Sequence, residues 1–108
     1  MTSKNIIELT DDNFDSNITK GNFVVDFWAS WCGPCRMMEP HFEQAAEELK
    51  GKVKFGKVNV EENSDLANRF QVMSIPTIIY FKDGEQVNRS TGAMPSDEIV
   101  ASAEESFG

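Results

Sequence analysis

The sequence predicts an α/β fold, with a central mixed sheet of five strands flanked by four helices. Strand-like apolar segments alternate with segments whose apolar residues recur at helical spacing, and short runs of turn residues separate them. Helices that connect consecutive strands favour parallel pairing, because a parallel pair needs a long crossover. Near the end, an Asp-Gly turn joins two strands directly and adds antiparallel strands to the sheet. The expected order is βαβαβαββα.

Four elements are expected in the first half of the chain. Residues 6–9 form a short strand, and the cap-type residues of segment 10–14 begin a helix that ends near Gly21. Residues 23–29 are almost continuously apolar, as in a strand that is buried on both faces. A long helix follows, with an apolar stripe directed inward. The stripe consists of Cys35, Met38, Phe42, Ala45, Ala46 and Leu49.

Five elements are expected in the second half. They are a strand at 53–60, a short capped helix at 64–70, strands at 77–81 and 85–90, and a final helix that begins at 95–98. The turn signal Asp83-Gly84 makes the two late strands a hairpin, with 85–90 at the edge of the sheet. The inner face of the final helix includes Ile99, Val100 and Ala103.

The length and charge are those of a small acidic protein. Its 108 residues suffice for one hydrophobic core, and no linker, repeat or low-complexity tract divides residues 1–108, so we expect a single domain. Ten lysines and arginines against eighteen acidic residues give a net charge of −8, spread along the chain. This balance argues against nucleic acid as a partner and favours a monomer.

The sequence also bears on location. Its first eight residues lack the apolar stretch of a signal peptide, and no segment approaches the roughly 20 apolar residues that span a bilayer. We therefore expect no membrane partner and a cytoplasmic, reducing compartment.

The two cysteines of the chain lie in the run Trp-Cys-Gly-Pro-Cys at residues 31–35, between the buried strand and the long helix. A Cys32–Cys35 bond closes about four residues and is worth roughly 2 kcal/mol, less than a bridge across a long loop, so a purely structural disulfide is the weaker alternative. Half of a zinc site is weaker still, because zinc needs four ligands and His41 is the only histidine; no metal is expected. The spacing favours a redox-active pair.

The position of the pair divides the chemistry between the two thiols. Cys32 precedes the helix, where free backbone N–H groups and the helix dipole favour a thiolate, which is the form that attacks a disulfide. Pro34 is tolerated there, since a first-turn N–H has no partner within the helix. Cys35 points inward from the first turn. We therefore expect Cys32, at the rim, to attack and the shielded Cys35 to resolve the mixed disulfide.

Asp26 places a carboxylate within the most apolar strand of the chain. Burial raises the pKa of such a group, because it disfavours the charged form. We expect Asp26 to take the proton of Cys35 during resolution, through water, with Lys57 of the next strand as its charge partner. A buried ion pair with only a structural role is the alternative.

An apolar surface is expected around the first cysteine, on which an extended partner chain could lie. For each of its residues, ordinary packing or turn geometry is the alternative. The residues are Trp31, Ile75, Pro76, Gly92 and Ala93.

Taken together, these residues resemble the thioredoxin family over essentially the whole chain. One Cys-x-x-Cys motif is a weak signal, whereas the whole set in this order is specific. Glu39 and His41 depart from the family pattern at positions where smaller or apolar residues are expected, which bears on the choice of partners. The resemblance rests on Asp26, Phe27-Trp28-Ala29-Ser30-Trp31-Cys32-Gly33-Pro34-Cys35-Arg36, Pro40, Lys57, Ile75-Pro76-Thr77, Phe81-Lys82-Asp83-Gly84 and Gly92.

The resemblance implies the thioredoxin fold and a protein-disulfide reductase, a thiol–disulfide oxidoreductase. Gly33 and Pro34 are typical of reducing members. Members that make or shuffle disulfides usually carry histidine beside the second cysteine, so a secreted oxidase or isomerase is disfavoured. The implied roles are Cys32 as nucleophile, Cys35 as resolving thiol, Asp26 and Lys57 as a proton-transfer pair, and Pro76 in a cis peptide that faces the cysteines.

The resemblance also implies the route of the electrons. No cofactor is bound, and the redox-active Cys32–Cys35 disulfide carries electrons from a thioredoxin reductase to disulfide-containing target proteins. The alternative from another class is a redox-independent binding module, which uses the apolar surface around Cys32.

Overall fold

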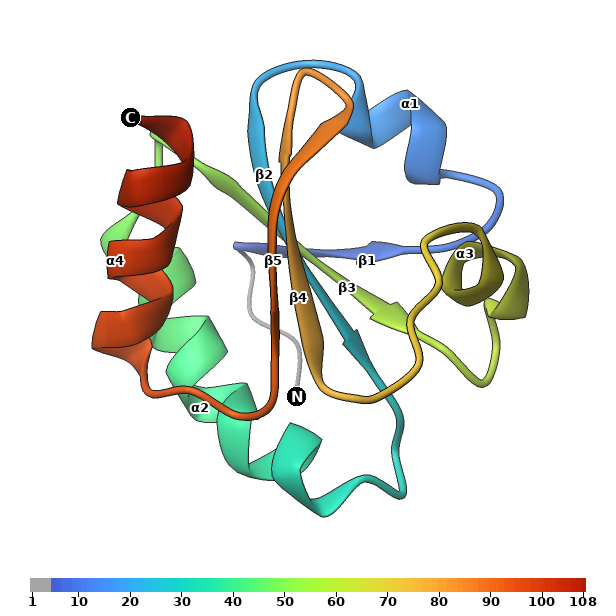
Figure 1. Ribbon diagram of the computed structural model, residues 1–108. Coiled ribbons are helices and arrows are strands. Elements are labelled where there is room, and N and C mark those ends of the chain that lie inside the picture. The colour runs from blue at the N-terminus through green and yellow to red at the C-terminus, as the bar shows by residue number, and fades with distance from the viewer. Residues whose placement is uncertain (1–4) are drawn as a thin grey trace.

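The computed structural model describes residues 5–108, which contain all the expected elements in the expected order (Figure 1). The segment whose sequence argued against a signal peptide lies partly outside these residues. The strands are β1 (Ile6–Leu9), β2 (Asn22–Trp28), β3 (Lys54–Asn59), β4 (Thr77–Lys82) and β5 (Glu85–Thr91). The helices are α1 (Phe14–Ile18), α2 (Gly33–Glu48), α3 (Ser64–Arg69) and α4 (Ser96–Phe107).

The first helix is shorter than expected, because it ends at Ile18 rather than near Gly21. The residues after it form the turn into β2, and Gly21 there has a φ of 82°, in the left-handed region that favours glycine. The N–H of Gly21 donates to Oδ1 of Asp83 at 2.8 Å, and the N–H of Asp83 donates back to the carbonyl oxygen of Gly21 at 2.9 Å. These two hydrogen bonds join the turn after α1 to the β4–β5 turn.

The sheet is mixed, as the sequence predicts. Its strand order is β1-β3-β2-β4-β5. Both β1 and β2 run parallel to β3, whereas β2 and β4, and β4 and β5, are antiparallel. The hairpin therefore adds the antiparallel strands, and β5 lies at the edge.

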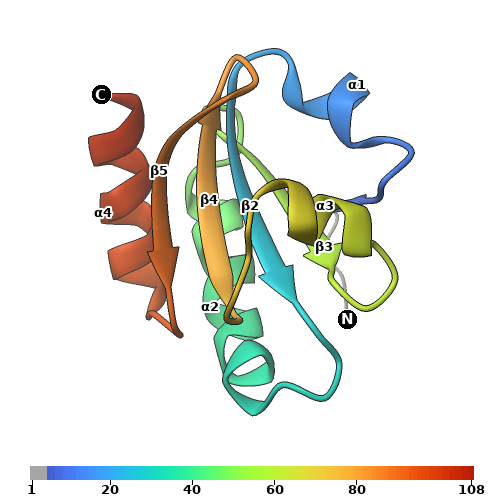
Figure 2. The ribbon, with the colours of Figure 1, turned by 45° about the vertical axis from the view of Figure 1, so that its right-hand side comes forward.

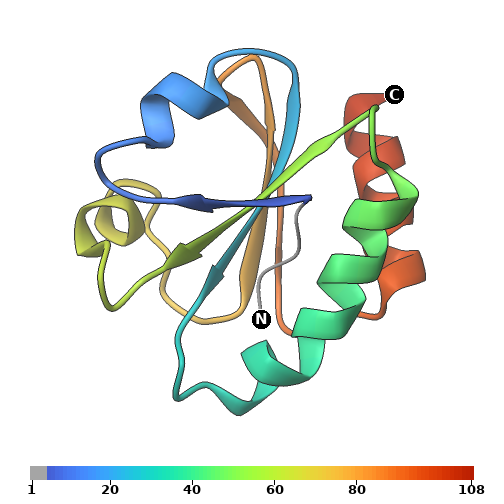
Figure 3. The same ribbon diagram turned by 180° about the vertical axis from the view of Figure 1, so that it is seen from behind.

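Helices cover both faces of the sheet (Figures 1 and 2). Helices α2 and α4 lie together on one side, and α1 and α3 lie on the other, which the view from behind also shows (Figure 3). Successive side chains of β2 point to opposite faces of the sheet and so pack against both helix layers. Val24 packs with Phe42 of α2, whereas Val25 packs in the cluster that contains Phe14 of α1. Within residues 5–108, no helix is long and apolar enough to cross a membrane.

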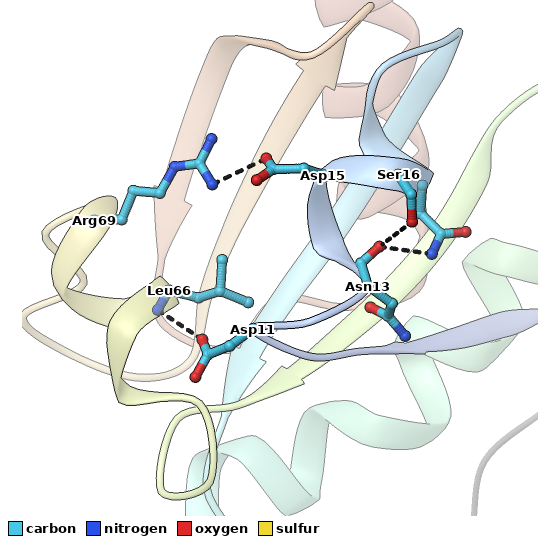
Figure 4. Close-up of polar contacts among 7 residues, drawn as sticks. Asp11, Asn13, Asp15, Ser16, Leu66 and Arg69 are labelled. Atoms are coloured by element: carbon cyan, nitrogen blue, oxygen red, sulfur yellow. Dashed lines mark hydrogen bonds and ion pairs between the residues drawn. The ribbon is translucent and has the colours of Figure 1, made fainter.

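Polar contacts join α3 to α1 and to the segment before α1, on the same side of the sheet (Figure 4). Arg69 of α3 forms an ion pair with Asp15 of α1 at 3.0 Å, and Oδ1 of Asp11 accepts from the N–H of Leu66 at 3.1 Å. The Arg69–Asp15 pair is exposed and so contributes little to stability. The contact of Asp11 satisfies an N–H in the first turn of α3, which has no partner within the helix.

The strand register brings three loops to one end of the sheet. Phe27 of β2 lies opposite Thr77 of β4, and Thr77 lies opposite Thr91 of β5. The cysteine run follows β2, Pro76 precedes β4, and Gly92 follows β5. Segments far apart in the sequence therefore meet where β2 ends.

Gly56 in the middle of β3 has no room for a side chain. A Cβ at this position would lie 2.5 Å from Cδ1 of Leu9 and 2.9 Å from Cε1 of Phe23, two fully buried side chains. We expect Gly56→Ala to lower the free energy of unfolding by about 1–3 kcal/mol, because the core must shift to admit the methyl group. Urea denaturation measures this. Gly33→Ala is the matched control, since nothing lies within 4 Å of its Cβ; equal stability of the two variants would contradict the prediction.

Candidate active site

Cys32 and Cys35 form a disulfide at the start of α2, with Cα atoms 5.3 Å apart. Cys32 is the N-cap residue: its Sγ accepts from the N–H of Cys35 at 3.2 Å, and its carbonyl oxygen accepts from the N–H of Arg36 at 3.1 Å. Pro34 lies in the first turn, as expected. The sulfur of Cys32 therefore lies where an N–H group of the helix terminus is directed at it, which suits a thiolate.

The expected contrast in exposure between the two cysteines is wrong for the disulfide form. Cys32 is 5% exposed and Cys35 is 4% exposed. Cys32 packs in a small apolar cluster with Ala29 and Ile75, and its Sγ lies 3.9 Å from the carbonyl oxygen of Ile75. The loop before β4 covers it, a long-range contact that helix spacing cannot predict.

Asp26 is buried beneath the helix, as the sequence predicts. It faces α2 and is 2% exposed. Burial raises its pKa from 3.8 to about 7, with the positive charge of Lys57 lowering it and the negative charge of Glu39 raising it. No group among the described residues forms a hydrogen bond with its Oδ1. This carboxyl group can therefore hold or release a proton near neutral pH.

Lys57 is next to Asp26 in the sheet register, but its ammonium group pairs elsewhere. Nζ lies 2.9 Å from Oε2 of Glu39 and 4.6 Å from the centre of the Trp28 ring. Lys57 is the cation whose charge lowers the pKa of Asp26, as expected, but its ion pair is with Glu39. Lys57 acts on Asp26 through space, while its ion pair joins β3 to α2.

Glu39 is the site residue that the sequence reasoning missed in this role. It is half-buried on α2, and the hydrogen bond that it accepts from Lys57 lowers the pKa of its carboxyl group. A signal was present, because Glu39 follows Cys35 by four residues and so lies on the same face of the helix.

Asp26, Lys57 and Glu39 line a cavity of about 20 Å³. Its volume has room for about one water molecule, and three of the side chains around it are ionisable carboxyl or ammonium groups. In the described part of the chain, no three His, Cys, Asp or Glu side chains are placed to hold a metal ion. The lining residues are Asp26, Trp28, Cys35, Arg36, Glu39 and Lys57.

Pro76 forms a cis peptide bond with Ile75, as the resemblance implies. Its carbonyl oxygen accepts from the N–H of Gly92 at 2.8 Å. Gly92 has a φ of 91°, which glycine adopts without strain. Pro76 is buried, so it supports the expected apolar surface from below rather than forming part of it.

The remaining surface residues lie around two separate depressions. Trp31, which is 69% exposed, and the half-buried Ile75 line one of about 270 Å³, together with Met73, which is 92% exposed. Ala93 lines another, of about 220 Å³. Trp31 and Ile75 thus line one depression and Ala93 the other. The sequence analysis did not identify Met73 as part of this surface, because only its exposure in the fold marks it.

The second depression also contains His41, which the sequence reasoning treated as a departure from the family pattern. Its imidazole Nδ1 accepts from the N–H of Ser96 at 3.4 Å, at the start of α4. His41 therefore contacts the terminus of a neighbouring helix while its side chain remains exposed. Its other neighbours there are Met37, Met38, Met94 and Pro95.

Comparison with known proteins agrees with this geometry. The family model described as Thioredoxin matches residues 5–105. The chain is 48% identical over 95 residues to a protein named Thioredoxin from Staphylococcus saprophyticus, covering 88% of this chain and 91% of that protein. Proteins of the same name from Staphylococcus haemolyticus and Staphylococcus aureus are 49% and 45% identical over the same shares. With its mixed five-stranded sheet, its four helices and its Cys-x-x-Cys disulfide, the chain belongs to the thioredoxin family.

Proposed function

We propose that this protein is a protein-disulfide reductase, a thiol–disulfide oxidoreductase that acts as a single domain over residues 1–108. The observation that carries the proposal is the Cys32–Cys35 disulfide at the start of α2, beside the buried carboxyl group of Asp26. Family membership supports the activity. The redox-active disulfide takes the place of a bound cofactor.

The first step is attack on the substrate. The Cys32 thiolate of the reduced protein attacks one sulfur of a substrate disulfide, a mixed disulfide forms, and the other substrate sulfur leaves as a thiolate. The N-cap position supports this role, because the N–H of Cys35 is directed at the Cys32 sulfur. Gly33 and Pro34 allow the tight turn that places it there.

The second step resolves the mixed disulfide. Cys35 gives its proton to Asp26, its thiolate attacks the sulfur of Cys32, and the second substrate sulfur leaves as a thiolate. Two electrons have then passed to the substrate, and the Cys32–Cys35 disulfide is formed. Both Asp26 and Cys35 line the 20 Å³ cavity, which supports proton transfer through one water molecule. The positive charge of Lys57 assists by favouring the Asp26 carboxylate that accepts the proton.

The partners follow from this cycle. Target proteins bind through an extended segment at Trp31, Ile75, Gly92 and Ala93, beside the disulfide. A thioredoxin reductase returns two electrons to the pair after each turnover. We propose a cytoplasmic monomer without nucleic-acid or membrane partners, in keeping with the net charge of −8.

Reduction of insulin disulfides, with dithiothreitol as the electron source, tests the proposal. We expect the purified protein to accelerate the reduction well beyond dithiothreitol alone, and an equal rate would contradict the reductase. A Cys32→Ser, Cys35→Ser double variant separates the redox role from a binding module. Biological function that survives in this variant would favour binding, whereas its loss supports electron transfer.

A further inference from the structure

Three charged groups from three elements meet behind the disulfide. Asp26 lies on β2, Lys57 on β3 and Glu39 on α2. The register makes Asp26 and Lys57 neighbours, yet the ammonium group of Lys57 lies 2.9 Å from Glu39, and Oδ1 of Asp26 has no hydrogen-bond partner among the described residues. One cation thus stands between two carboxyl groups and pairs with the one on the helix.

We propose that Glu39 is a positioning residue, which binds the ammonium group of Lys57, keeps it from pairing with Asp26, and so sets the pH range over which Asp26 accepts the proton of Cys35. The inference rests on the role proposed above for Asp26 and adds a residue to it.

The difference in burial explains why Lys57 pairs with Glu39 rather than with Asp26. The side chain of Glu39 is 33% exposed, so its carboxylate keeps part of its hydration, whereas the Asp26 carboxylate must lose nearly all of it to stay charged. Pairing Lys57 with Glu39 is therefore more favourable than pairing it with Asp26, because Glu39 is already ionised and Asp26 would first have to lose its proton. The pKa of Glu39 is lowered by this hydrogen bond, while burial holds that of Asp26 at about 7.

The other surroundings of Asp26 leave few other charges to act on it. Opposite it, β4 presents the apolar Ile78, and along β2 the next side chain on the same face is the indole of Trp28. Helix α2 adds Cys35 and Arg36, of which Arg36 is exposed. Lys57 and Glu39 are therefore the charged neighbours that act on the titration of Asp26.

The consequence for the reaction follows from proton-transfer chemistry. A general base works best when its pKa lies near the working pH. If Lys57 turned to Asp26, it would favour the carboxylate, lower its pKa and weaken it as a base for the Cys35 thiol. Glu39 thus keeps Asp26 a base of suitable strength near neutral pH.

The titration of Asp26 in Glu39→Gln tests this directly, by the ¹³C chemical shift of its carboxyl carbon in the disulfide form. We expect the pKa of Asp26 to fall by about 1, because the released ammonium group moves to it. Glu48→Gln is the matched control, since it removes one negative charge from the exposed far end of α2. Equal titration curves for the two variants would overturn the proposal.

A double-mutant cycle with Lys57→Met shows whether Glu39 acts on Asp26 through Lys57 or by its own charge. If Glu39 acts by holding the lysine, most of the shift caused by Glu39→Gln disappears in the Lys57→Met background. An equal shift in both backgrounds would overturn positioning, because Glu39 would then act by its own charge. Should Lys57→Met not fold, a crystal structure of Glu39→Gln decides: Nζ within about 4 Å of the Asp26 carboxylate is expected, and Nζ left beside residue 39 overturns the proposal.

These measurements need no enzyme activity, so they fail separately from the reductase function. Failure of insulin reduction in the wild type would contradict the proposed function and leave the titration result intact. A shifted pKa of Asp26 with an unchanged pH profile of the resolving step would support the positioning of Lys57, but would contradict the proton role of Asp26.

Discussion

Cys32→Ser is expected to reduce the catalysed rate of insulin reduction by roughly 10³-fold or more, to the rate of dithiothreitol alone. A serine hydroxyl does not ionise near neutral pH, so no nucleophile remains at the start of α2. The fold should persist, because Cys32 lies at the edge of the core and the disulfide closes a short loop. The measurement is the turbidity of precipitating insulin B chain at pH 7.

Cys35→Ser is the matched control for this loss. It removes the same disulfide but keeps the attacking thiol. We expect it to form a mixed disulfide with insulin that is stable to gel electrophoresis without reductant, whereas Cys32→Ser forms none. A mixed disulfide trapped on Cys35 in the Cys32→Ser variant would reverse the two assigned roles.

Asp26→Asn is expected to change how stability depends on pH. The pKa of Asp26 is about 7 in the folded protein, against about 4 in the unfolded chain. Below pH 4 both states hold the proton; as the pH rises towards 7, the unfolded state releases it first, so the wild type loses stability. Asparagine does not titrate and escapes this loss. The difference in free energy of unfolding, variant minus wild type, therefore grows by about 4 kcal/mol between pH 4 and pH 8.

Urea denaturation of the disulfide forms at the two pH values measures this difference. Asp12→Asn is the matched control, because it removes the same charge from an exposed position. We expect its stability to follow that of the wild type at both pH values. A difference between Asp26→Asn and the wild type that is equal at pH 4 and pH 8 would contradict a raised pKa.

Much of the candidate site could be predicted because its signals are local. Cys32 and Pro34 mark the start of a helix by their chemistry, and Asp26 is conspicuous as a lone carboxylate in an apolar strand. The raised pKa of Asp26 follows from that pattern, since burial is its largest cause. The partner of Lys57 could not be predicted in this way. Its flexible side chain reaches several groups, and the choice depends on where α2 crosses the sheet.

Periodicity, turn residues and helix caps act over a few residues, so the sequence alone predicts the order of the elements, the faces that they bury and the position of the cysteine pair. The packing of the elements against one another sets which distant groups meet. It covers Cys32 with the loop at Ile75, places Trp31 and Ala93 beside two depressions, and pairs Lys57 with Glu39. The contact between Lys57 and Glu39 joins residues 18 apart, and that between Cys32 and Ile75 joins residues 43 apart; the geometry of both depends on how the layers pack.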